Sequence, residues 1–184
     1  QMMPRLYLIR HGKAAAGWDA DSDPGLDGTG RAQAERMADA LAPLGPLPIV
    51  CSPLRRTRET AAALEARWRS KAAIEPAVAE VPSPIADLAK RGAWLREVMV
   101  RRWGDLDPAL QAWRQQLLQC LLTLPTDTAV VTHFVAINVA VGRAIGEDDV
   151  VCFRPDNCSC TILDTGEHVL ELVQRGAEAE TAVG

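Results

Sequence analysis

The chain has 184 residues, of which 48% are hydrophobic, and a formal net charge of -4. This size and composition suit one folded domain with a substantial core, and they exclude a largely disordered chain. The negative charge argues against nonspecific nucleic-acid binding, which needs a basic face, although one pocket can still attract an anion. We expect a single domain over residues 1–174 and a flexible, small and acidic tail over residues 175–184.

Two features of the sequence predict its compartment. No stretch approaches the roughly 18 continuous apolar residues of a membrane span, and the first residues lack the long apolar segment of a signal peptide. The five cysteines are an odd number, which favours free thiols in a reducing environment. We therefore expect a cytoplasmic protein without a membrane partner. Cys158 and Cys160 alternate along an expected strand, which places neighbouring residues on opposite faces and argues against a metal site there.

Short apolar runs alternate with helical patterns along the chain. We expect strands at residues 6–9, 49–51 and 128–132, and helices at 29–44, 54–68, 84–103, 108–124 and 135–145. Residues 73–81 are ambiguous and are expected to be extended in part. Closing strands are expected at 150–153, 160–163 and 169–173, with the last two forming a hairpin around 164–166. Trp94 and Trp113 fall on apolar helix stripes and are interpreted as core residues.

This alternation of strands and helices predicts an α/β fold, a three-layer α/β/α sandwich with a mainly parallel central sheet. In such sheets, ligands bind beyond the carboxyl ends of the strands. His11, Ser52 and His133 each follow an apolar run directly. We therefore expect these three side chains to meet at one edge of the sheet.

The triplet Arg10-His11-Gly12 ends the first of these runs. An imidazole is a competent nucleophile near neutral pH, and a fixed arginine beside it can neutralise an anion. This combination suits a covalent phosphoryl intermediate. Two further segments at strand ends strengthen the interpretation, Ser52-Pro53-Leu54-Arg55-Arg56-Thr57-Arg58-Glu59-Thr60-Ala61 and Val130-Val131-Thr132-His133.

In their order and spacing these segments resemble the histidine phosphatase superfamily, the phosphoglycerate-mutase-like proteins, over residues 5 to about 165. The resemblance implies that His11 attacks phosphorus and becomes phosphohistidine, while Arg10 and Arg56 grip the phosphoryl oxygens. His133 would donate a hydrogen bond to the phosphate, as a cation once substrate is bound. Gly12 would let the backbone approach the ligand.

By its position in the family motif, Arg56 rather than Arg55 or Arg58 is the phosphate-binding arginine. We expect Arg55 and Arg58 to lie on an exposed helix face. A glutamate after the second helix would protonate the leaving group and then activate water. Glu80 fits this position best, and Glu75 is the competing candidate. Asn157, in a loop that precedes a closing strand, is a further candidate for contact with phosphate.

Departures from the mutase-type pattern favour a phosphatase. Ala14 and Gly17 stand where mutase-type relatives carry polar phosphate contacts. Phe134 follows His133 where glycine is frequent, and we expect it to narrow the pocket or to line it with an aromatic edge. The segment between Glu80 and His133 is too short for the large substrate-covering insertion of mutases. We expect a metal-independent phosphatase that hydrolyses a phosphate monoester, with no cofactor and with a phosphorylated small molecule, or a phosphoprotein, as partner.

Two alternatives stay open, a phosphohistidine (phosphoramidate) phosphatase, suggested by Lys13-Ala14, and a catalytically weak member that binds a phosphorylated ligand. A cysteine-dependent phosphatase is disfavoured, because four residues rather than five separate Cys51 from Arg56.

Several other charged residues are expected to lie at the surface. Lys13 is expected to be solvated, and His168 to be exposed. The aspartates at positions 19, 21, 23 and 27 are interpreted as turn formers rather than as a calcium loop. Three arginines, at positions 91, 101 and 102, could read a second anionic group, but an exposed helix face is favoured for them.

Overall fold

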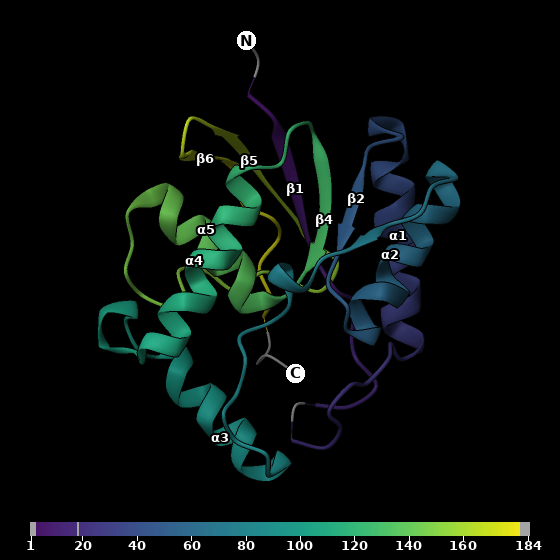
Figure 1. The fold of residues 1–184 in the computed structure, drawn as a ribbon. Helices are drawn as coiled ribbons and strands as arrows, with labels where there is room; N and C mark the ends of the chain where they lie inside the picture. Colours follow the sequence, from purple (N-terminus) through teal and green to yellow (C-terminus); the bar gives the residue numbers. More distant parts are fainter. Residues whose placement is uncertain (1–2, 18, 181–184) are drawn as a thin grey trace.

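A computed structural model describes residues 3–17 and 19–180. Its centre is one sheet with the strand order β3-β2-β4-β1-β5-β6 (Figure 1). The strands are β1 (Arg5–Arg10), β2 (Ile49–Cys51), β3 (Ala73–Ile74), β4 (Thr128–Thr132), β5 (Cys160–Gly166) and β6 (Val169–Gln174). The first four run parallel, and β5 and β6 are antiparallel to their neighbours. The expected mainly parallel sheet is confirmed.

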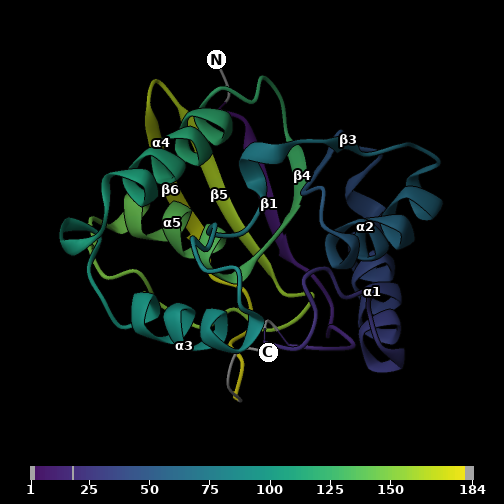
Figure 2. The same ribbon diagram turned by 60° about the horizontal axis from the view of Figure 1, so that its bottom comes forward.

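Helices cover both faces of the sheet, which confirms the three-layer arrangement (Figure 1). The α-helices are α1 (Gly28–Leu41), α2 (Arg55–Trp68), α3 (Leu88–Met99), α4 (Pro108–Leu122) and α5 (Phe134–Ile145). Short 3-10 turns are η1 (Ala42–Leu44), η2 (Pro76–Val78) and η3 (Trp103–Asp105). The helices α1 and α2 lie on one side of the sheet and α4 and α5 on the other, while α3 lies beyond the carboxyl ends of the parallel strands (Figure 1 and Figure 2).

The alternation of side chains along β1 and β4 builds two cores. Leu8 and Val130 belong to the cluster under α4 and α5, whereas Ile9 and Val131 belong to the cluster under α1 and α2. The expected core tryptophans, Trp94 and Trp113, are partly buried and pack against the first cluster. The ring of Trp113 stacks on that of the buried Trp103, with centroids 6.1 Å apart. Both strands are therefore buried on both faces, as parallel strands usually are.

Several element boundaries differ from the expectations. The helix expected over 84–103 is shorter, because the Asp87 carboxylate caps its start by accepting hydrogen bonds from the N–H groups of Ala89 and Lys90. The hairpin turns later than expected, at Glu167 and His168, which both have positive φ as a tight two-residue hairpin requires.

The strand expected over residues 150–153 is wrong. Its apolar side chains do enter the core, but the N–H groups of Cys152 and Phe153 donate to Asn138 Oδ1 at 2.7 and 3.1 Å. A buried side chain on α5 thus satisfies the backbone groups that a neighbouring strand would otherwise pair.

Part of the segment expected to be a flexible tail pairs with another loop. The N–H of Asp156 donates to Ala177 O at 2.8 Å, and the N–H of Ala179 donates to Arg154 O at 2.7 Å. The last four residues of that segment, 181–184, lie outside the described residues. No helix among the described residues is long and apolar enough to cross a membrane.

Candidate active site

The carboxyl ends of three adjacent parallel strands bring the predicted residues together. The N–H of His11, after β1, donates to Thr132 O on β4 at 3.2 Å, and the N–H of Ser52, after β2, donates to Val131 O at 3.1 Å. His133 follows β4 directly. The ring centroids of His11 and His133 are 5.3 Å apart, with the planes inclined by 61°. This edge of the sheet therefore assembles the side chains that the strand-end argument placed there.

The His11 imidazole is held in one tautomer. Its Nδ1 lies 2.7 Å from Gly12 O, and because a carbonyl oxygen only accepts, Nδ1 carries the proton. The Nε2 lone pair accepts a hydrogen bond from Arg56 Nε at 3.2 Å. Burial, reinforced by the Arg56 and Arg10 cations, lowers the pKa of His11 well below its usual range. At neutral pH the ring is therefore uncharged, with a lone pair on Nε2.

Arg10 and Arg56 bring two buried cations to this ring, and they are only 3% and 4% exposed. One Arg10 amino group donates to Pro155 O at 3.0 Å, and Arg10 Nε is buried without a hydrogen-bond partner among the described residues. Burial lowers the pKa of Arg10 to about 10, so the guanidinium remains charged at neutral pH. The unpartnered donor and the positive charge both suit an anion.

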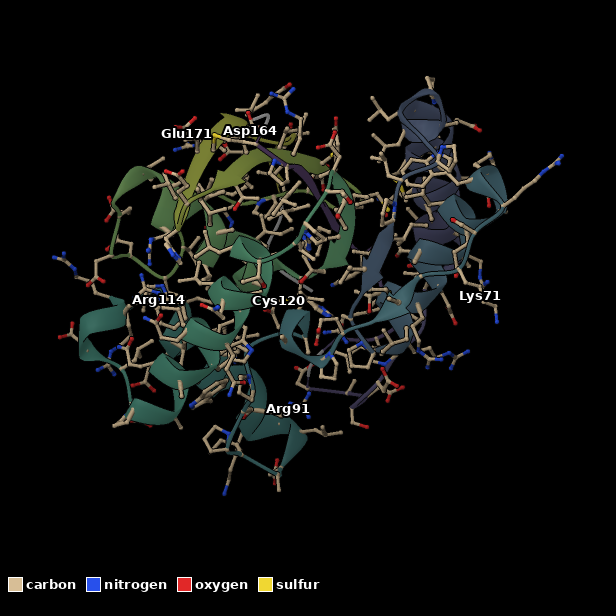
Figure 3. All side chains as sticks on the ribbon, turned by 45° about the horizontal axis from the view of Figure 1, so that its top comes forward. Lys71, Arg91, Arg114, Cys120, Asp164 and Glu171 are labelled. Atoms are coloured by element: carbon tan, nitrogen blue, oxygen red, sulfur yellow. The ribbon has the colours of Figure 1, made fainter. Side chains whose placement is uncertain are left out.

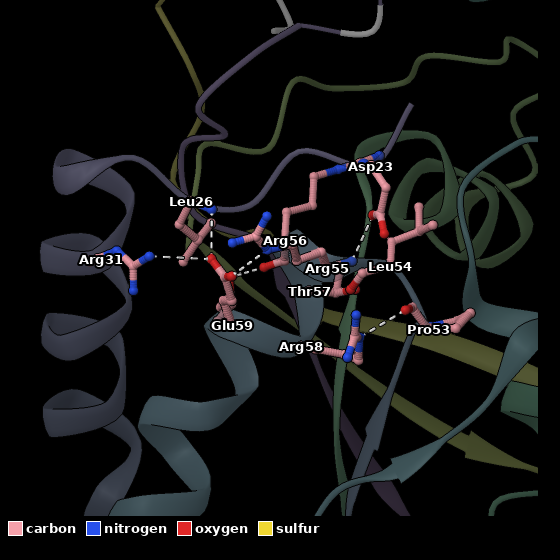
Figure 4. Close-up of polar contacts among 11 residues, drawn as sticks. Asp23, Leu26, Arg31, Pro53, Leu54, Arg55, Arg56, Thr57, Arg58 and Glu59 are labelled. Carbon is pink, nitrogen blue, oxygen red and sulfur yellow. Dashed lines mark hydrogen bonds and ion pairs between the residues drawn. The ribbon is translucent and has the colours of Figure 1, made fainter. Parts of the chain in front are cut away.

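Figure 4 shows three arginines at the start of α2, Arg55, Arg56 and Arg58, which differ in their surroundings. Arg55 is exposed and pairs with Glu59 at 2.9 Å, and Arg58 is exposed and donates to Pro53 O at 2.9 Å. Glu59 also accepts the N–H of Leu26, at 2.8 Å, and so ties the loop before α1 to α2. Of the three arginines in this segment, only Arg56 is buried at the site, as the motif position predicted.

His133 forms a hydrogen bond with Ser52, to which the sequence analysis gave no chemical role. Its Nε2 lies 2.8 Å from Ser52 Oγ, and both side chains are fully buried. The other ring nitrogen, Nδ1, is buried with no hydrogen-bond partner among the described residues. Burial, with Arg56 nearby, lowers the pKa of His133 well below its usual range, so the ring is neutral in the ligand-free protein. The signal for Ser52 was its place at the start of the second motif.

The Glu80 carboxylate lies at the N-terminus of α5. Its oxygens accept hydrogen bonds from the N–H groups of Val135 at 3.0 Å, Ala136 at 3.1 Å and Val81 at 3.1 Å. Burial raises the pKa of Glu80, and these hydrogen bonds and Arg56 oppose the increase. The competing candidate, Glu75, instead caps η2 by accepting the N–H of Ala77 at 3.0 Å. The geometry therefore places Glu80, rather than Glu75, beside the buried arginines.

Gly12 and Asn157, two residues predicted to contact the ligand, form hydrogen bonds at and next to the backbone of His11. The N–H of Gly12 donates to Thr60 Oγ1 at 2.9 Å, and a Cβ at this position would lie 2.6 Å from Gly30 O. Gly12 is therefore needed for the close approach of α1, and the approach of its backbone to a ligand stays a prediction. Asn157 Nδ2 donates to His11 O at 3.1 Å and thereby fixes the segment that carries His11.

Phe134 lies against Arg10 at the first position of α5. The Arg10 guanidinium carbon is 5.3 Å from the ring centroid, and that of Arg154 is 5.6 Å from it. Such cation–π contacts contribute about 0.5–2 kcal/mol, more when desolvated. The ring is 1% exposed, so it forms a wall behind Arg10 rather than a rim of the pocket.

The remaining candidates have other surroundings. Lys13 is exposed and lies 3.8 Å from Asp27, as expected for a solvated lysine. Burial raises the pKa of the Cys51 thiol to about 12, which agrees with its interpretation as a core residue rather than a nucleophile. Among the described residues, no group of three or more His, Cys, Asp or Glu side chains could hold a metal ion.

Two cavities flank this cluster. One, of about 440 Å³, lies beside Arg10 and Asn157 and is lined further by Lys13, Gln33 and Asp156. The other, of about 200 Å³, lies beside Arg56 and Glu80. Arg10 therefore lines one cavity, and Arg56 lines the other together with Glu80.

Comparisons with known proteins place the chain in a family. The model of the histidine phosphatase superfamily (branch 1) matches residues 6–177. Among curated proteins, the probable phosphoglycerate mutase GpmB of Erwinia tasmaniensis is 25% identical, with 88% of this chain and 85% of that protein covered.

Solved structures of several phosphatases share the fold. The alpha-ribazole phosphatase of Shigella flexneri is 20% identical (98% of this chain and 100% of that chain covered, TM-score 0.70). A mycobacterial glucosyl-3-phosphoglycerate phosphatase complexed with VO3 is 22% identical (95% and 100% covered, TM-score 0.72). The phosphoserine phosphatase of Entamoeba histolytica, in complex with 3-phosphoglyceric acid, is 18% identical (95% and 98% covered, TM-score 0.74). With the family model matching nearly the whole sequence, the chain belongs to the histidine phosphatase superfamily.

Proposed function

We propose that this protein is a metal-independent phosphatase that hydrolyses a phosphate monoester of a small molecule through a phosphohistidine on His11. The observation that carries the proposal is the buried cluster of Arg10, Arg56, His11 and His133. Within it, Arg10 Nε and His133 Nδ1 have no partner among the described residues. Unsatisfied buried donors are costly, and the oxygens of a phosphoryl group would satisfy both.

The first step transfers the phosphoryl group to the protein. His11 Nε2 attacks phosphorus as the bond to the ester oxygen breaks, and Arg56 moves its hydrogen bond from Nε2 to a phosphoryl oxygen. Arg10 and Arg56 neutralise the charge that spreads over the phosphoryl oxygens. Protonated Glu80 gives its proton to the departing oxygen, so that the alcohol leaves uncharged.

The second step regenerates the free protein. The Glu80 carboxylate takes a proton from a water molecule, whose oxygen attacks the phosphorus of phosphohistidine. The bond from phosphorus to Nε2 breaks, which leaves inorganic phosphate, neutral His11 and protonated Glu80. The raised pKa of Glu80, caused by burial, favours the protonated form that the first step needs.

Hydrolysis of p-nitrophenyl phosphate in the presence of EDTA tests the proposal. We expect turnover by the wild type, complete loss in His11→Ala, and no loss in His168→Ala, which removes the remaining histidine from the hairpin between β5 and β6. Brief reaction with a ³²P-labelled ester, followed by denaturation, should trap an acid-labile, base-stable label on the wild type and none on His11→Ala.

Other outcomes contradict specific parts of the proposal. Turnover that persists in His11→Ala excludes His11 as the nucleophile, and turnover abolished by EDTA excludes metal independence. If a panel of phosphate esters is bound but never hydrolysed, the protein is a phosphate-binding member of the family rather than a phosphatase.

A further inference from the structure

The cavity of about 200 Å³ beside Glu80 lies on the side from which a leaving group would receive its proton. Arg56 and Glu80 form one part of its lining, and the rest is Ser22, Leu54, Ala79, Val81, Pro82, Ser83 and Arg91. Its volume is below the roughly 300–1,000 Å³ of pockets for drug-sized ligands. If His11 and the arginines hold the phosphoryl group, this cavity is where the part of the leaving alcohol next to the ester oxygen would lie.

Arg91 adds a positive charge to the lining of this cavity. It comes from α3, is half-buried, and lines the cavity together with Arg56. Burial chiefly lowers the pKa of the Arg56 guanidinium, and the charge of Arg91 contributes a smaller part. Figure 3 labels Arg91 on α3, beyond the carboxyl ends of the parallel strands. The expectation of an exposed helix face therefore does not hold for Arg91.

The other two arginines considered with Arg91 are exposed at the surface. Arg101 lies 3.6 Å from Glu97, and Arg102 lies 3.6 Å from Asp148. Neither lines the cavity beside Glu80.

The charged side chains that line the cavity indicate which chemical groups a ligand there would carry. The cations are Arg56 and Arg91, and the one carboxyl is Glu80, which must be protonated when it acts as an acid. Arg91 then adds a second cation to the lining beside Arg56, and the charge of the nearby Asp23 carboxylate, which also acts on Arg56, offsets part of the positive charge. A guanidinium binds a carboxylate or a second phosphate through two parallel hydrogen bonds, and hydroxyls such as those of Ser22 and Ser83 can add to them.

We propose that Arg91 is a specificity-determining residue that binds an anionic group on the leaving alcohol. The substrate is then a small phosphate monoester with a second acidic group, on the Glu80 side of the phosphorus. This inference rests on the proposed function, because it takes the cavity beside Glu80 as the leaving-group site.

Matched pairs of esters test the proposal. The probes are the phosphate esters of glycolate, 3-hydroxypropanoate and 4-hydroxybutanoate, each compared with its uncharged amide of nearly the same shape. We expect the wild type to prefer the acid in at least one pair by about tenfold or more in kcat/KM. In Arg91→Gln this ratio should fall to near one, and Arg91→Lys should restore part of it. Since the ratio compares two substrates in one variant, a general loss of activity cancels.

Lys90→Gln is the matched control, since it removes one positive charge from an exposed neighbour on the same helix and should leave the ratio unchanged. Equal hydrolysis of acid and amide in every pair by the wild type would overturn the role of Arg91 while leaving the phosphatase proposal intact. A preference that survives Arg91→Gln would do the same. Failure of the proposed function gives a different result, namely no His11-dependent hydrolysis of any ester.

Discussion

The hydroxyl oxygen of Ser52 and the Nε2 atom of His133 are 2.8 Å apart, and both side chains are 0% exposed. Because the N–H of Leu54 already donates to Ser52 Oγ, at 3.3 Å, the hydroxyl hydrogen is available to His133 Nε2. When the hydroxyl donates to Nε2, the neutral imidazole carries its proton on the unpartnered Nδ1, where it can donate to a phosphoryl oxygen. We infer that Ser52 selects this tautomer of His133.

Ser52→Ala should consequently lower kcat/KM for p-nitrophenyl phosphate about tenfold, the effect of roughly 1.4 kcal/mol from an unsatisfied buried imidazole nitrogen. Ser70→Ala, beyond the far end of α2, makes the same chemical change away from the site and should have no effect. Equal activity of wild type and Ser52→Ala would show that the tautomer of His133 does not depend on this hydrogen bond.

Glu80 gives the reaction a characteristic pH dependence. The lowered pKa of His11 keeps the nucleophile unprotonated well into the acidic range, and the raised pKa of Glu80 keeps the acid protonated to a higher pH than usual. Activity on an alkyl phosphate should therefore fall as the pH rises through the Glu80 pKa, which burial places above the usual range of a carboxyl. A measured pH–rate profile that increases steadily above neutrality would contradict this assignment.

Glu80→Gln should remove that alkaline decline and slow hydrolysis of an alkyl phosphate by about 10²–10⁴-fold. The loss should be smaller for p-nitrophenyl phosphate, because its leaving group departs readily without a proton. Glu75→Gln is the matched control and should retain the profile, because Glu75 caps η2. If the larger loss appears in Glu75→Gln, then Glu75 is the acid.

Phe134 packs against the Arg10 guanidinium, which also donates to Pro155 O. Phe134→Leu should weaken inhibition by inorganic phosphate by roughly 2- to 30-fold, which corresponds to the 0.5–2 kcal/mol of a cation–π contact. Phe153→Leu is a close control, because this buried ring lies 5.7 Å from the Arg175 guanidinium carbon rather than next to Arg10. Competition assays that give both variants the same inhibition constant would show that Phe134 only fills space.

Gly12 is required by packing. Gly12→Ala places a Cβ 2.6 Å from Gly30 O, in contact with backbone that cannot rotate away, and should lower the free energy of unfolding by about 1–3 kcal/mol. Gly28→Ala, whose Cβ would meet nothing within 4 Å, should be neutral or stabilising. Urea unfolding of both variants measures the difference. A Gly12→Ala variant as stable as the wild type would mean that α1 can shift without cost.

The sequence predicts those site residues that local patterns place, and it does not predict the contacts made by residues far away in the chain. His11, Ser52 and His133 follow buried strands whose apolar runs are visible locally, and parallel pairing then brings their ends to one edge. Arg56 follows from its place in a motif. The contacts that hold these groups, such as Pro155 O on Arg10 and Asn157 on His11, come from residues more than a hundred positions away. No local pattern encodes them.

The sequence by itself determined the three-layer α/β architecture, the family, and the set of phosphate-binding candidates, because hydrophobic periodicity and short motifs are local properties. Only the tertiary structure decided that residues 150–153 form a loop bonded to Asn138, that Gly12 faces Gly30, and that Arg91 lines the cavity beside Glu80. The physical reason is the same in each case. A backbone donor, a glycine and an arginine can each be satisfied in several ways, and the packing of distant segments selects one of them.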